Sequence, residues 1–371
     1  MHDARSRTRS PVLIIGTERS GSNLLRLILN AHSSIAVPHP PHFMRYLSPV
    51  EAAYGDLTRE EARRAAVRDA LTLLRVHIHP WDCTVDEDAV VEAADPSLFG
   101  VVAAIYEEYR RTHGKERWGC KSTFMVEHVD TVLAHYPQAR FVWLVRDPRD
   151  VAASAKRSVF GPYHPYLTAG LWVREQQLGQ RALERHGPDV VHLLHYEQLV
   201  ARPEEEITRL CAFLDEPFEP AMLEPHRTGA ARQIAGLSAS WRNSSRPISG
   251  RSVGRYRTGL TDTERRQVEL RAGRMMEQLG YDPGADAAGA VRPPSPVGLF
   301  ARNLGLRLAT EYRSLRGDAN HARRWRRDAT VWRLRTAARL RSRGGAPSPP
   351  PAVSPGASPG SPRPRHPGGN P

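Results

Sequence analysis

The sequence predicts an α/β fold in which helices cover both faces of a central parallel sheet. Two observations carry this prediction. Short apolar runs alternate along the chain with amphipathic segments at helical spacing, which is typical of parallel sheets with crossover helices. The first run, Pro11–Gly16, ends in a glycine-serine turn that leads into a helical segment. A length of 371 residues allows one large domain with appendages.

The elements of the first half follow in order. Pro11–Gly16 is expected to be a buried strand, and the helix after it has an apolar face made of Leu24, Leu25, Leu27, Ile28 and Ala31. Residues Ser34–Val37 have the pattern of a second strand, which ends at the proline-rich segment that follows. Residues 59–76 are expected to form a helix.

The second half contains the strongest strand pattern, Ala139–Val145, followed by a helix that runs through Lys156. The other expected elements are a helix over Val126–Tyr136, a strand over Val190–Leu194, and helices over Pro203–Leu214 and 261–279. Pro203 suits the first turn of its helix, because the N–H that proline lacks would have no partner within the helix there.

Composition divides the chain into unequal parts. Residues 1–10 are expected to be a disordered basic lead and 11–285 the main domain. An Ala/Pro/Gly-rich linker over 286–299 then leads to a basic helical extension over 300–343. The Pro/Ser/Gly-rich tail over 344–371 is expected to be disordered.

The positive charge of the chain is concentrated in the extension. The formal net charge is +13, and residues 301–343 contain thirteen arginines against three acidic residues, a local charge of +10. The main domain is therefore close to neutral, which argues against a nucleic-acid enzyme.

Cysteine usage and the amino terminus bear on the compartment. The three widely spaced cysteines, Cys83, Cys120 and Cys211, fit neither a disulfide framework nor a zinc pattern, which favours a reducing compartment. The apolar run Val12–Ile15 is too short for a signal peptide or a membrane span. We expect a cytoplasmic protein.

The first chemical motif is the segment Gly16–Leu25, between the first strand and its helix. Such a turn directs backbone N–H groups and the positive end of a helix dipole toward one anionic group. Gly16 and Gly21 have the spacing of a nucleotide P-loop, but Ser22 stands where a Walker motif needs lysine. Arg19 is the cation within the loop. Taken alone, such a turn also occurs as a tight bend without a ligand.

The second motif is the segment from Leu144 to Ser154. Arg146 stands at the carboxyl end of the best strand, where ligands bind in open α/β sheets, and Ser154 lies two turns into the next helix. A guanidinium suits a dianionic phosphate, and a hydroxyl can complete the contact. The alternative is a surface loop in which Arg146 pairs with Asp150.

Together these motifs resemble the sulfotransferases that use 3′-phosphoadenosine 5′-phosphosulfate (PAPS). The segment His195–Val200 before Arg202 and Pro203 is similar to a conserved segment of that family whose tyrosine lies near the nucleotide. Ser252–Arg257 is similar to the late loop that closes over the adenosine. The resemblance spans about residues 11–283, is nearest to bacterial and tyrosylprotein-type members, and implies a P-loop-like three-layer fold.

The resemblance also implies roles for matching residues. The 5′-phosphosulfate would be held by Arg19, Ser20, Gly21, Ser22 and Asn23. The 3′-phosphate would be held by Arg146 and Ser154, and the pocket completed by Tyr196, Ser252 and Arg255. No metal is implied. The reaction would be in-line transfer of a sulfuryl group, with Arg19 and Lys121 stabilising the charge that develops on the leaving oxygen. Lys121 is otherwise an ordinary surface lysine.

The general base is where this sequence departs from the family. Many similar enzymes have a glutamate just after the second strand, and Pro40 stands there, between His39 and His42. In a polyproline II segment residues three apart point the same way, so both imidazoles would face one site. A carboxylate from elsewhere is the alternative, with both histidines structural.

Two further clusters are open to interpretation. His77 and His79, close to Asp82 and Cys83, have side chains that bind metals, but nothing in their spacing fixes a coordination geometry. The basic extension, with Leu306, Trp325, Trp332, Leu334 and Leu340 among its arginines, could contact an anionic membrane or an acidic partner, or pack on the domain as a solvated helix.

The resemblance leaves the acceptor open. A hydroxyl or amine on a carbohydrate, glycolipid or small natural product is expected, with residues 44–118 and 158–186 shaping its site. Two other functions remain: a P-loop kinase or other nucleoside-triphosphate enzyme, against which the missing Walker lysine counts, and a non-catalytic nucleotide-binding relative.

Overall fold

The computed structural model describes residues 10–237, 244–284, 292–318 and 320–344. Nearly all of the expected lead and tail, and residues 286–291 of the expected linker, lie outside these ranges.

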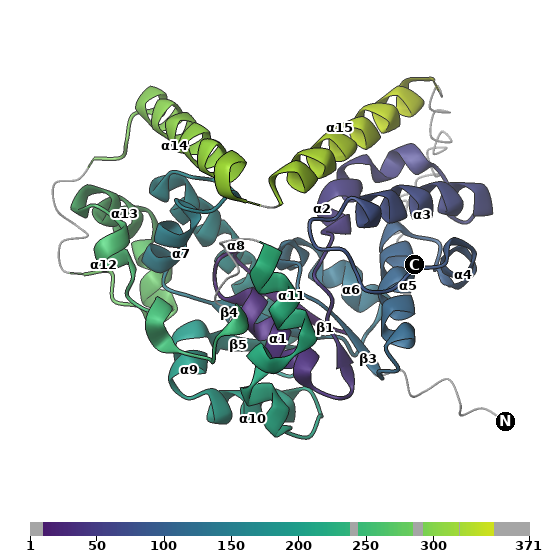
Figure 1. The fold of residues 1–371 in the computed structure, drawn as a ribbon, viewed down its shortest axis with the longest axis horizontal. Coiled ribbons are helices and arrows are strands. Elements are labelled where there is room, and N and C mark those ends of the chain that lie inside the picture. Colours follow the sequence, from purple (N-terminus) through teal and green to yellow (C-terminus); the bar gives the residue numbers. More distant parts are fainter. Residues whose placement is uncertain (1–9, 238–243, 285–291, 319, 345–371) are drawn as a thin grey trace, which may run out of the picture.

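A single parallel sheet of five strands forms the centre of the described fold, in the spatial order β2-β3-β1-β4-β5. Figure 1 shows the helices packed on both of its sides. The strands are β1 (Val12–Gly16), β2 (Ile35–Ala36), β3 (Arg117–Cys120), β4 (Arg140–Val145) and β5 (Val191–His195). The expected α/β fold with a parallel sheet is therefore confirmed.

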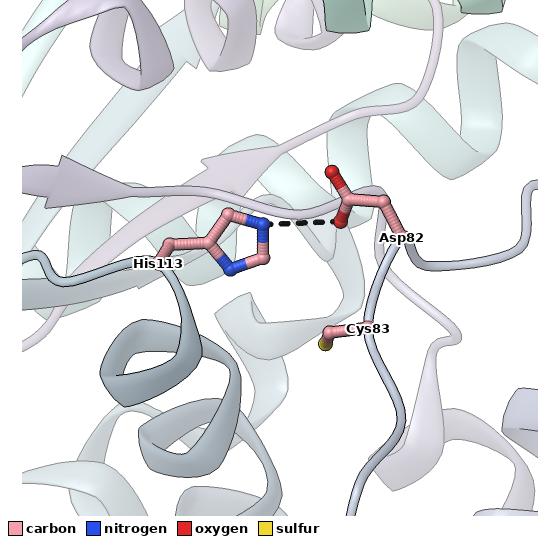
Figure 2. Close-up of side chains that lie close together, drawn as sticks. All are labelled: Asp82, Cys83 and His113. Atoms are coloured by element: carbon pink, nitrogen blue, oxygen red, sulfur yellow. Dashed lines mark hydrogen bonds and ion pairs between the residues drawn. The ribbon is translucent and has the colours of Figure 1, made fainter.

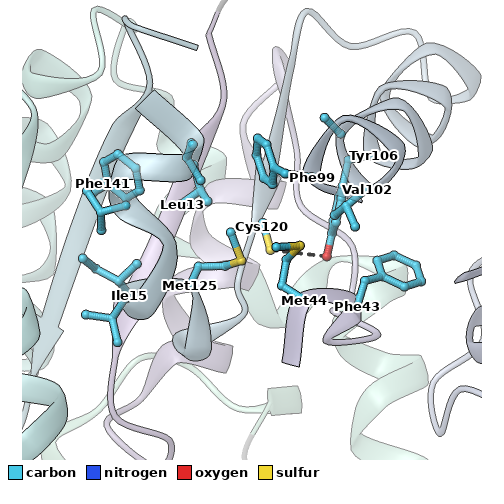
Figure 3. Close-up of a cluster of buried hydrophobic side chains, with 14 of the residues drawn as sticks. Leu13, Ile15, Phe43, Met44, Phe99, Val102, Tyr106, Cys120, Met125 and Phe141 are labelled. Carbon is cyan, nitrogen blue, oxygen red and sulfur yellow. Dashed lines mark hydrogen bonds between the residues drawn. The ribbon is translucent and has the colours of Figure 1, made fainter. Parts of the chain in front are cut away.

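Each face of the sheet has its own hydrophobic core, because side chains alternate along a strand. Leu13 and Ile15 of β1 point into the larger core, which Figure 3 shows between the sheet and the helices that carry Phe43 and Tyr106. Val12 and Ile14 point into the smaller core on the opposite face. All four side chains are fully buried, which explains why the strand is apolar throughout.

Most predicted helices are present with small shifts in their ends. They are α1 (Ser22–Ala31), α3 (Glu60–Arg75), α6 (Val129–His135), α7 (Pro148–Ala155), α10 (Pro203–Phe213) and α13 (Asp262–Gln278). The predicted helix over Val126–Tyr136 begins as a 3₁₀ turn over Thr123–His128 before α6.

Several elements were not predicted. Strand β3 is short and contains Gly119, where an added Cβ would lie 2.9 Å from the side chain of Val37 in the neighbouring segment. The unpredicted helices are α2 (Phe43–Leu47), α4 (Glu87–Ala93), α5 (Leu98–Thr112), α8 (Pro165–His186), α9 (Tyr196–Ala201), α11 (Gly229–Leu237) and α12 (Tyr256–Gly259).

The basic extension forms two helices, α14 (Pro296–Gly317) and α15 (His321–Gly344), so helix begins four residues before the expected boundary at residue 300. In Figure 1 they diverge along the upper edge of the molecule. Helix α15 packs on α3 and on the 3₁₀ segment Ser48–Tyr54. Within the described ranges, none of the helices combines the length and the apolar character needed to cross a bilayer.

The strand order places a crevice at the carboxyl ends of β1 and β4. These strands are neighbours, but the chain leaves β1 toward β2 at one edge of the sheet and leaves β4 toward β5 at the other. Their loops therefore separate, and such a switch point is where open α/β sheets bind ligands.

Candidate functional site

A cavity of about 850 Å³ lies at this crevice. Residues that follow all five strands line it, and they include every sequence-predicted site residue except Ser20. The predicted residues that it brings together are Arg19, Gly21, Ser22, Asn23, His39, His42, Lys121, Arg146, Ser154, Tyr196, Ser252 and Arg255. Ser20 belongs to the same loop but is fully buried, and its hydroxyl has no hydrogen-bond partner among the described residues.

The glycine loop leads to an uncapped helix. Gly21 stands at the N-cap of α1 with φ of 96°, and no side chain caps the helix. The N–H groups that begin every helix lack partners within it, so those of Ser22 and Asn23 are available to an anion at this end. Arg19 also has a left-handed backbone, with φ of 73°, which is uncommon for a residue with a Cβ.

Tyr196 fixes the shape of this loop. A Cβ added to Gly21 would lie 2.3 Å from the Tyr196 ring, so the loop can approach the ring this closely only with glycine there. The Arg146 guanidinium lies over the same ring, 4.6 Å from its centroid. Tyr196 thus packs between the glycine loop and the second motif.

Arg146 connects three segments of the cavity wall. Its guanidinium donates to the backbone carbonyl of Arg19 at 3.0 Å and to that of Ser252. It also lies 3.6 Å from Asp150. The predicted pairing of Arg146 with Asp150 is therefore present, but both side chains are buried in the cavity wall and do not form a surface loop.

Asp150 in turn holds the late loop in place. Its carboxylate accepts hydrogen bonds from the backbone N–H groups of Gly254 and Tyr256, both at 2.8 Å. This places Ser252 and Arg255 at the cavity, although they lie about a hundred residues from Arg146 in the sequence.

The two predicted anion-binding motifs meet directly. The Arg19 side chain donates to the Ser154 hydroxyl at 3.1 Å, so the glycine loop touches the helix after β4. Burial lowers the pKa of Arg19, and the nearby Arg146 lowers it further, whereas Glu18 opposes both. Two guanidinium groups held this close repel each other, and an anion between them would relieve that repulsion.

Lys121 extends the cationic wall toward the other end of the cavity. It follows β3 and is buried, so the surface-lysine alternative is wrong. Burial lowers its pKa to about 8; Arg26 and Arg19 add to this effect, and the nearby Glu18 opposes it. Its ammonium charge is therefore held less firmly than that of an ordinary lysine.

Both candidate histidines line the cavity, as predicted, but in different surroundings. His39 is almost fully buried, its Nδ1 lies 3.0 Å from Nε2 of His77, and its ring stacks on His79. His42 is half-buried and its Nδ1 lies 2.9 Å from the Ser122 hydroxyl. His42 has φ of 59°, so the segment departs from polyproline II at this residue.

Both imidazoles are neutral at physiological pH. Burial lowers the pKa of His42 well below 6.5, and the charges of Lys121 and Arg45 lower it further. The pKa of His39 falls in the same direction, mainly through burial and then through Lys121. A neutral imidazole can accept a proton, which is the requirement for a base.

The sequence did not single out six charged residues of the cavity lining, among them Arg246 and Arg251 near the late loop. Glu18 is adjacent to Arg19, Arg45 belongs to α2, Arg157 follows α7 and Arg327 lies on α15. Arg327 had no local signal, because it is one of thirteen arginines in the extension, and packing of α15 alone brings it to the cavity.

The lining as a whole is strongly cationic. Its acidic residues are Glu18 and Asp150, and its cationic residues are Arg19, Arg45, Lys121, Arg146, Arg157, Arg246, Arg251, Arg255 and Arg327. A concave surface with such an excess of positive charge attracts a ligand that carries several negative charges.

The histidines at positions 77 and 79 do not join Asp82 and Cys83 in one cluster of metal-ligand side chains among the described residues. Within the described ranges, the metal-ligand side chains that come together are Asp82, Cys83 and His113, without His77 or His79 (Figure 2). Both ring nitrogens of His113 are engaged, Nδ1 with the Tyr109 carbonyl and Nε2 with Asp82. Burial raises the pKa of Cys83 to about 11, which disfavours the thiolate that a metal requires.

Comparison with known proteins identifies the family. A family model described as the sulfotransferase family matches residues 11–220. Nodulation protein NoeE of Sinorhizobium fredii is 27% identical over 305 residues, which cover 75% of this chain and 68% of that protein. Protein-tyrosine sulfotransferase 1 of Danio rerio is 25% identical over 297 residues, 76% of this chain and 75% of the relative.

Solved structures agree at the level of the fold. The sulfotransferase domain from the curacin biosynthetic pathway superposes with a TM-score of 0.50 at 21% identity, covering 75% of this chain and 99% of that domain. The sulfotransferase domain of the Synechococcus PCC 7002 olefin synthase also superposes with a TM-score of 0.50, at 20% identity. The match covers 74% of this chain and 96% of that domain. The family model matches more than half of the chain, and its motifs assemble one cavity on a shared fold, so the chain belongs to the sulfotransferase family.

Proposed function

We propose that this enzyme transfers a sulfuryl group from PAPS to a hydroxyl or amine of a carbohydrate, glycolipid or small natural product. The observation that carries the proposal is the contact between two separate anion-binding motifs in one cationic cavity, through Arg19, Ser154 and Arg146. A nucleotide with anionic groups at both its 5′ and 3′ positions matches that arrangement.

The residues present fit this donor. The uncapped start of α1, with Ser22 and Asn23, and the side chain of Arg19 would hold the 5′-phosphosulfate. Arg146, Ser154 and Arg255 would hold the 3′-phosphate, and the loop fixed by Asp150 would cover the adenosine. When bound, PAPS supplies an activated sulfuryl group. Arg19 and Lys121, which both line the cavity, would stabilise charge on the leaving oxygen.

For the general base, the geometry favours His42 over His39. His42 is the more accessible of the two, and donation from its Nδ1–H to Ser122 would leave Nε2 free to accept a proton from the acceptor. Nδ1 of His39 pairs with His77 deeper in the protein, which suits a supporting role. Ser122 follows Lys121 directly, so one loop would position both the base and the cation.

The acceptor end of the cavity carries its own charge. Arg45 and Arg327 both lie near Tyr46, with guanidinium carbons 5.8 Å and 5.9 Å from the centroid of its ring. Both lower the pKa of His42, so both lie near the proposed base. We propose that the acceptor carries an anionic group close to the hydroxyl or amine that is sulfated.

Nucleotide preference tests the donor. We expect calorimetry to show tighter binding of adenosine 3′,5′-bisphosphate than of adenosine 5′-monophosphate or ATP. The monophosphate and ATP both lack the 3′-phosphate. Arg146→Ala should reduce that preference by at least about thirtyfold, since it removes one partner of a buried charge pair. Equal affinity for all three ligands would contradict the proposal and revive the nucleoside-triphosphate alternative.

Arg146 also contacts the loop carbonyls, so its loss could loosen the cavity as a whole. Ser154→Ala is the milder companion variant, because it removes one hydroxyl, which Arg19 contacts, from the same proposed phosphate site. If a substitution loosened the cavity as a whole, it would weaken the binding of adenosine 5′-monophosphate and of adenosine 3′,5′-bisphosphate equally. Loss of a specific 3′-phosphate contact weakens bisphosphate binding selectively.

Acceptor charge is tested at Arg327. With an acceptor that the wild type turns over, Arg327→Gln should raise the acceptor KM about tenfold through loss of a charge-assisted hydrogen bond. The affinity for adenosine 3′,5′-bisphosphate should not change. Arg326→Gln is the matched control, because it removes the same charge from an exposed neighbour outside the cavity lining. Equal effects of the two substitutions on KM would contradict the anionic-acceptor proposal.

A further inference from the structure

Helix α14 has an apolar stripe that faces away from the protein. The stripe consists of Val297, Phe300, Leu304, Leu308, Tyr312 and Leu315, with successive members three or four positions apart, so they share one side of the helix. All six are exposed, with 80% of Val297, 69% of Phe300 and 66% of Leu315 accessible.

The fully buried residues of the same helix are polar and lie on its opposite side, which faces the domain. The buried side chains of α14 are those of Thr310 and Ser314. Asn303 on the same side accepts hydrogen bonds from the backbone N–H groups of Tyr163 and His164, both at 3.0 Å. An ordinary surface helix buries its main apolar stripe, whereas α14 leaves this stripe exposed and buries only part of Leu299 and Leu306 on the domain side. Such a stripe marks an interaction surface.

Arginines flank the apolar stripe. Arg307 projects on one side of it and Arg316 on the other, and both are exposed. Their long side chains can extend past buried apolar groups and keep their charges in a polar layer.

Helix α15 adds aromatic side chains of the same kind. Trp325 and Trp332 are seven positions apart, share one side of α15, and are 60% and 68% exposed. Val331 and Ala338 on the other side are buried against the domain. In Figure 1, α14 and α15 form the outermost layer along the upper edge of the molecule. Tryptophan favours the boundary between the polar and apolar layers of a bilayer.

We propose that the stripe on α14, with the tryptophans of α15, docks the enzyme on the surface of an anionic lipid bilayer. An apolar stripe bordered by arginines matches the two layers of such a surface, since apolar groups enter the acyl boundary while guanidinium groups contact phosphates. The local charge of +10 over residues 301–343 selects anionic over neutral lipid. The enzyme would lie on the bilayer without crossing it.

Vesicle binding by the full chain tests the proposal without any enzymatic readout. We expect cosedimentation with vesicles of equal parts phosphatidylglycerol and phosphatidylcholine, and at least about tenfold weaker binding to phosphatidylcholine alone. The triple variant Phe300→Gln, Leu308→Gln and Leu315→Gln should lose at least about tenfold in binding. Glutamine keeps helix propensity, and the replaced side chains are exposed, so α14 should remain folded.

Charge is tested separately from apolar contact. Arg307→Gln with Arg316→Gln should weaken binding to the anionic vesicles by about fivefold for each arginine. The control variant Arg181→Gln with Arg185→Gln removes the same amount of charge from exposed positions of α8, which is distant from α14 in the sequence. It should have little effect on vesicle binding. Equal binding to neutral and anionic vesicles, or none to either, would overturn the proposal. A dimer in light scattering that the glutamine triple variant dissociates, without vesicle binding, would assign the stripe to a second copy of the chain.

Discussion

Replacing His42 with asparagine should lower kcat by about 10²–10⁴-fold, the usual contribution of a general base, and leave the affinity for adenosine 3′,5′-bisphosphate unchanged. Asparagine is the substitution of choice because His42 has a left-handed backbone, which asparagine tolerates better than most residues. Its side chain can also keep a hydrogen bond to Ser122. The measurement is single-turnover sulfate transfer to any acceptor that the wild type uses.

The pH dependence gives a second readout for the same variant. A base must be unprotonated, and burial together with Lys121 and Arg45 holds the pKa of His42 well below 6.5. In the wild type, kcat/KM should therefore stay level as the pH falls to about 6.5 and decrease only below it. In the asparagine variant this acidic decrease should disappear, because the titrating group is gone.

Two matched variants separate the competing bases. His39→Asn tests the second histidine, and Glu18→Gln tests the carboxylate that lines the cavity beside Arg19. Asp150 is less suited, because Arg146 and two backbone N–H groups already engage its carboxylate. If Glu18→Gln abolished transfer while His42→Asn retained it, the base would be a carboxylate and the histidine proposal would be wrong.

The parts of this protein that local pattern determines could be predicted from the sequence. Strand β1, and strand β4 after its first residue Arg140, are buried on both faces and apolar, and each ends at a motif whose residue types imply anion binding. Because the carboxyl ends of parallel strands share one edge of the sheet, residues that follow them could be expected in one cavity.

The parts that depend on long-range packing could not be predicted. Strand β3 has only four residues, with Arg117 and Gly119 among them, and becomes a strand because β1 and β2 provide partners on both sides. Arg327 reaches the cavity through the docking of α15, where Arg335 donates to the backbone carbonyls of Arg45 and Tyr46. No local feature distinguishes Arg327 from its neighbours in the sequence.

Helix α15 therefore carries residues of both the cavity and the outer surface. Arg327 lines the cavity, while Trp325, two positions earlier, points outward on the proposed membrane surface. The proposed acceptor site and the proposed membrane surface thus lie on one helix.

Lys121 should set the alkaline limit of the reaction. Burial lowers the pKa of its ammonium group from 10.5 to about 8, so the charge proposed to stabilise the leaving oxygen is lost as the pH rises through about 8. In the free enzyme, kcat/KM should therefore fall above about pH 8. The fall in kcat should come at higher pH, because a bound anionic nucleotide stabilises the ammonium form.

Two substitutions test this assignment, because both remove the group that titrates near pH 8 and only one of them keeps a positive charge. Lys121→Met should lower kcat by about 10²–10³-fold, the usual cost of removing one group that stabilises transition-state charge, and should leave no decrease near pH 8. Lys121→Arg keeps a charge that does not titrate in this range, so its rate should remain level well above pH 8. A decrease near pH 8 that persisted in Lys121→Arg would mean that another group controls it. In that case, Arg19 would be the remaining side chain proposed to stabilise the leaving oxygen.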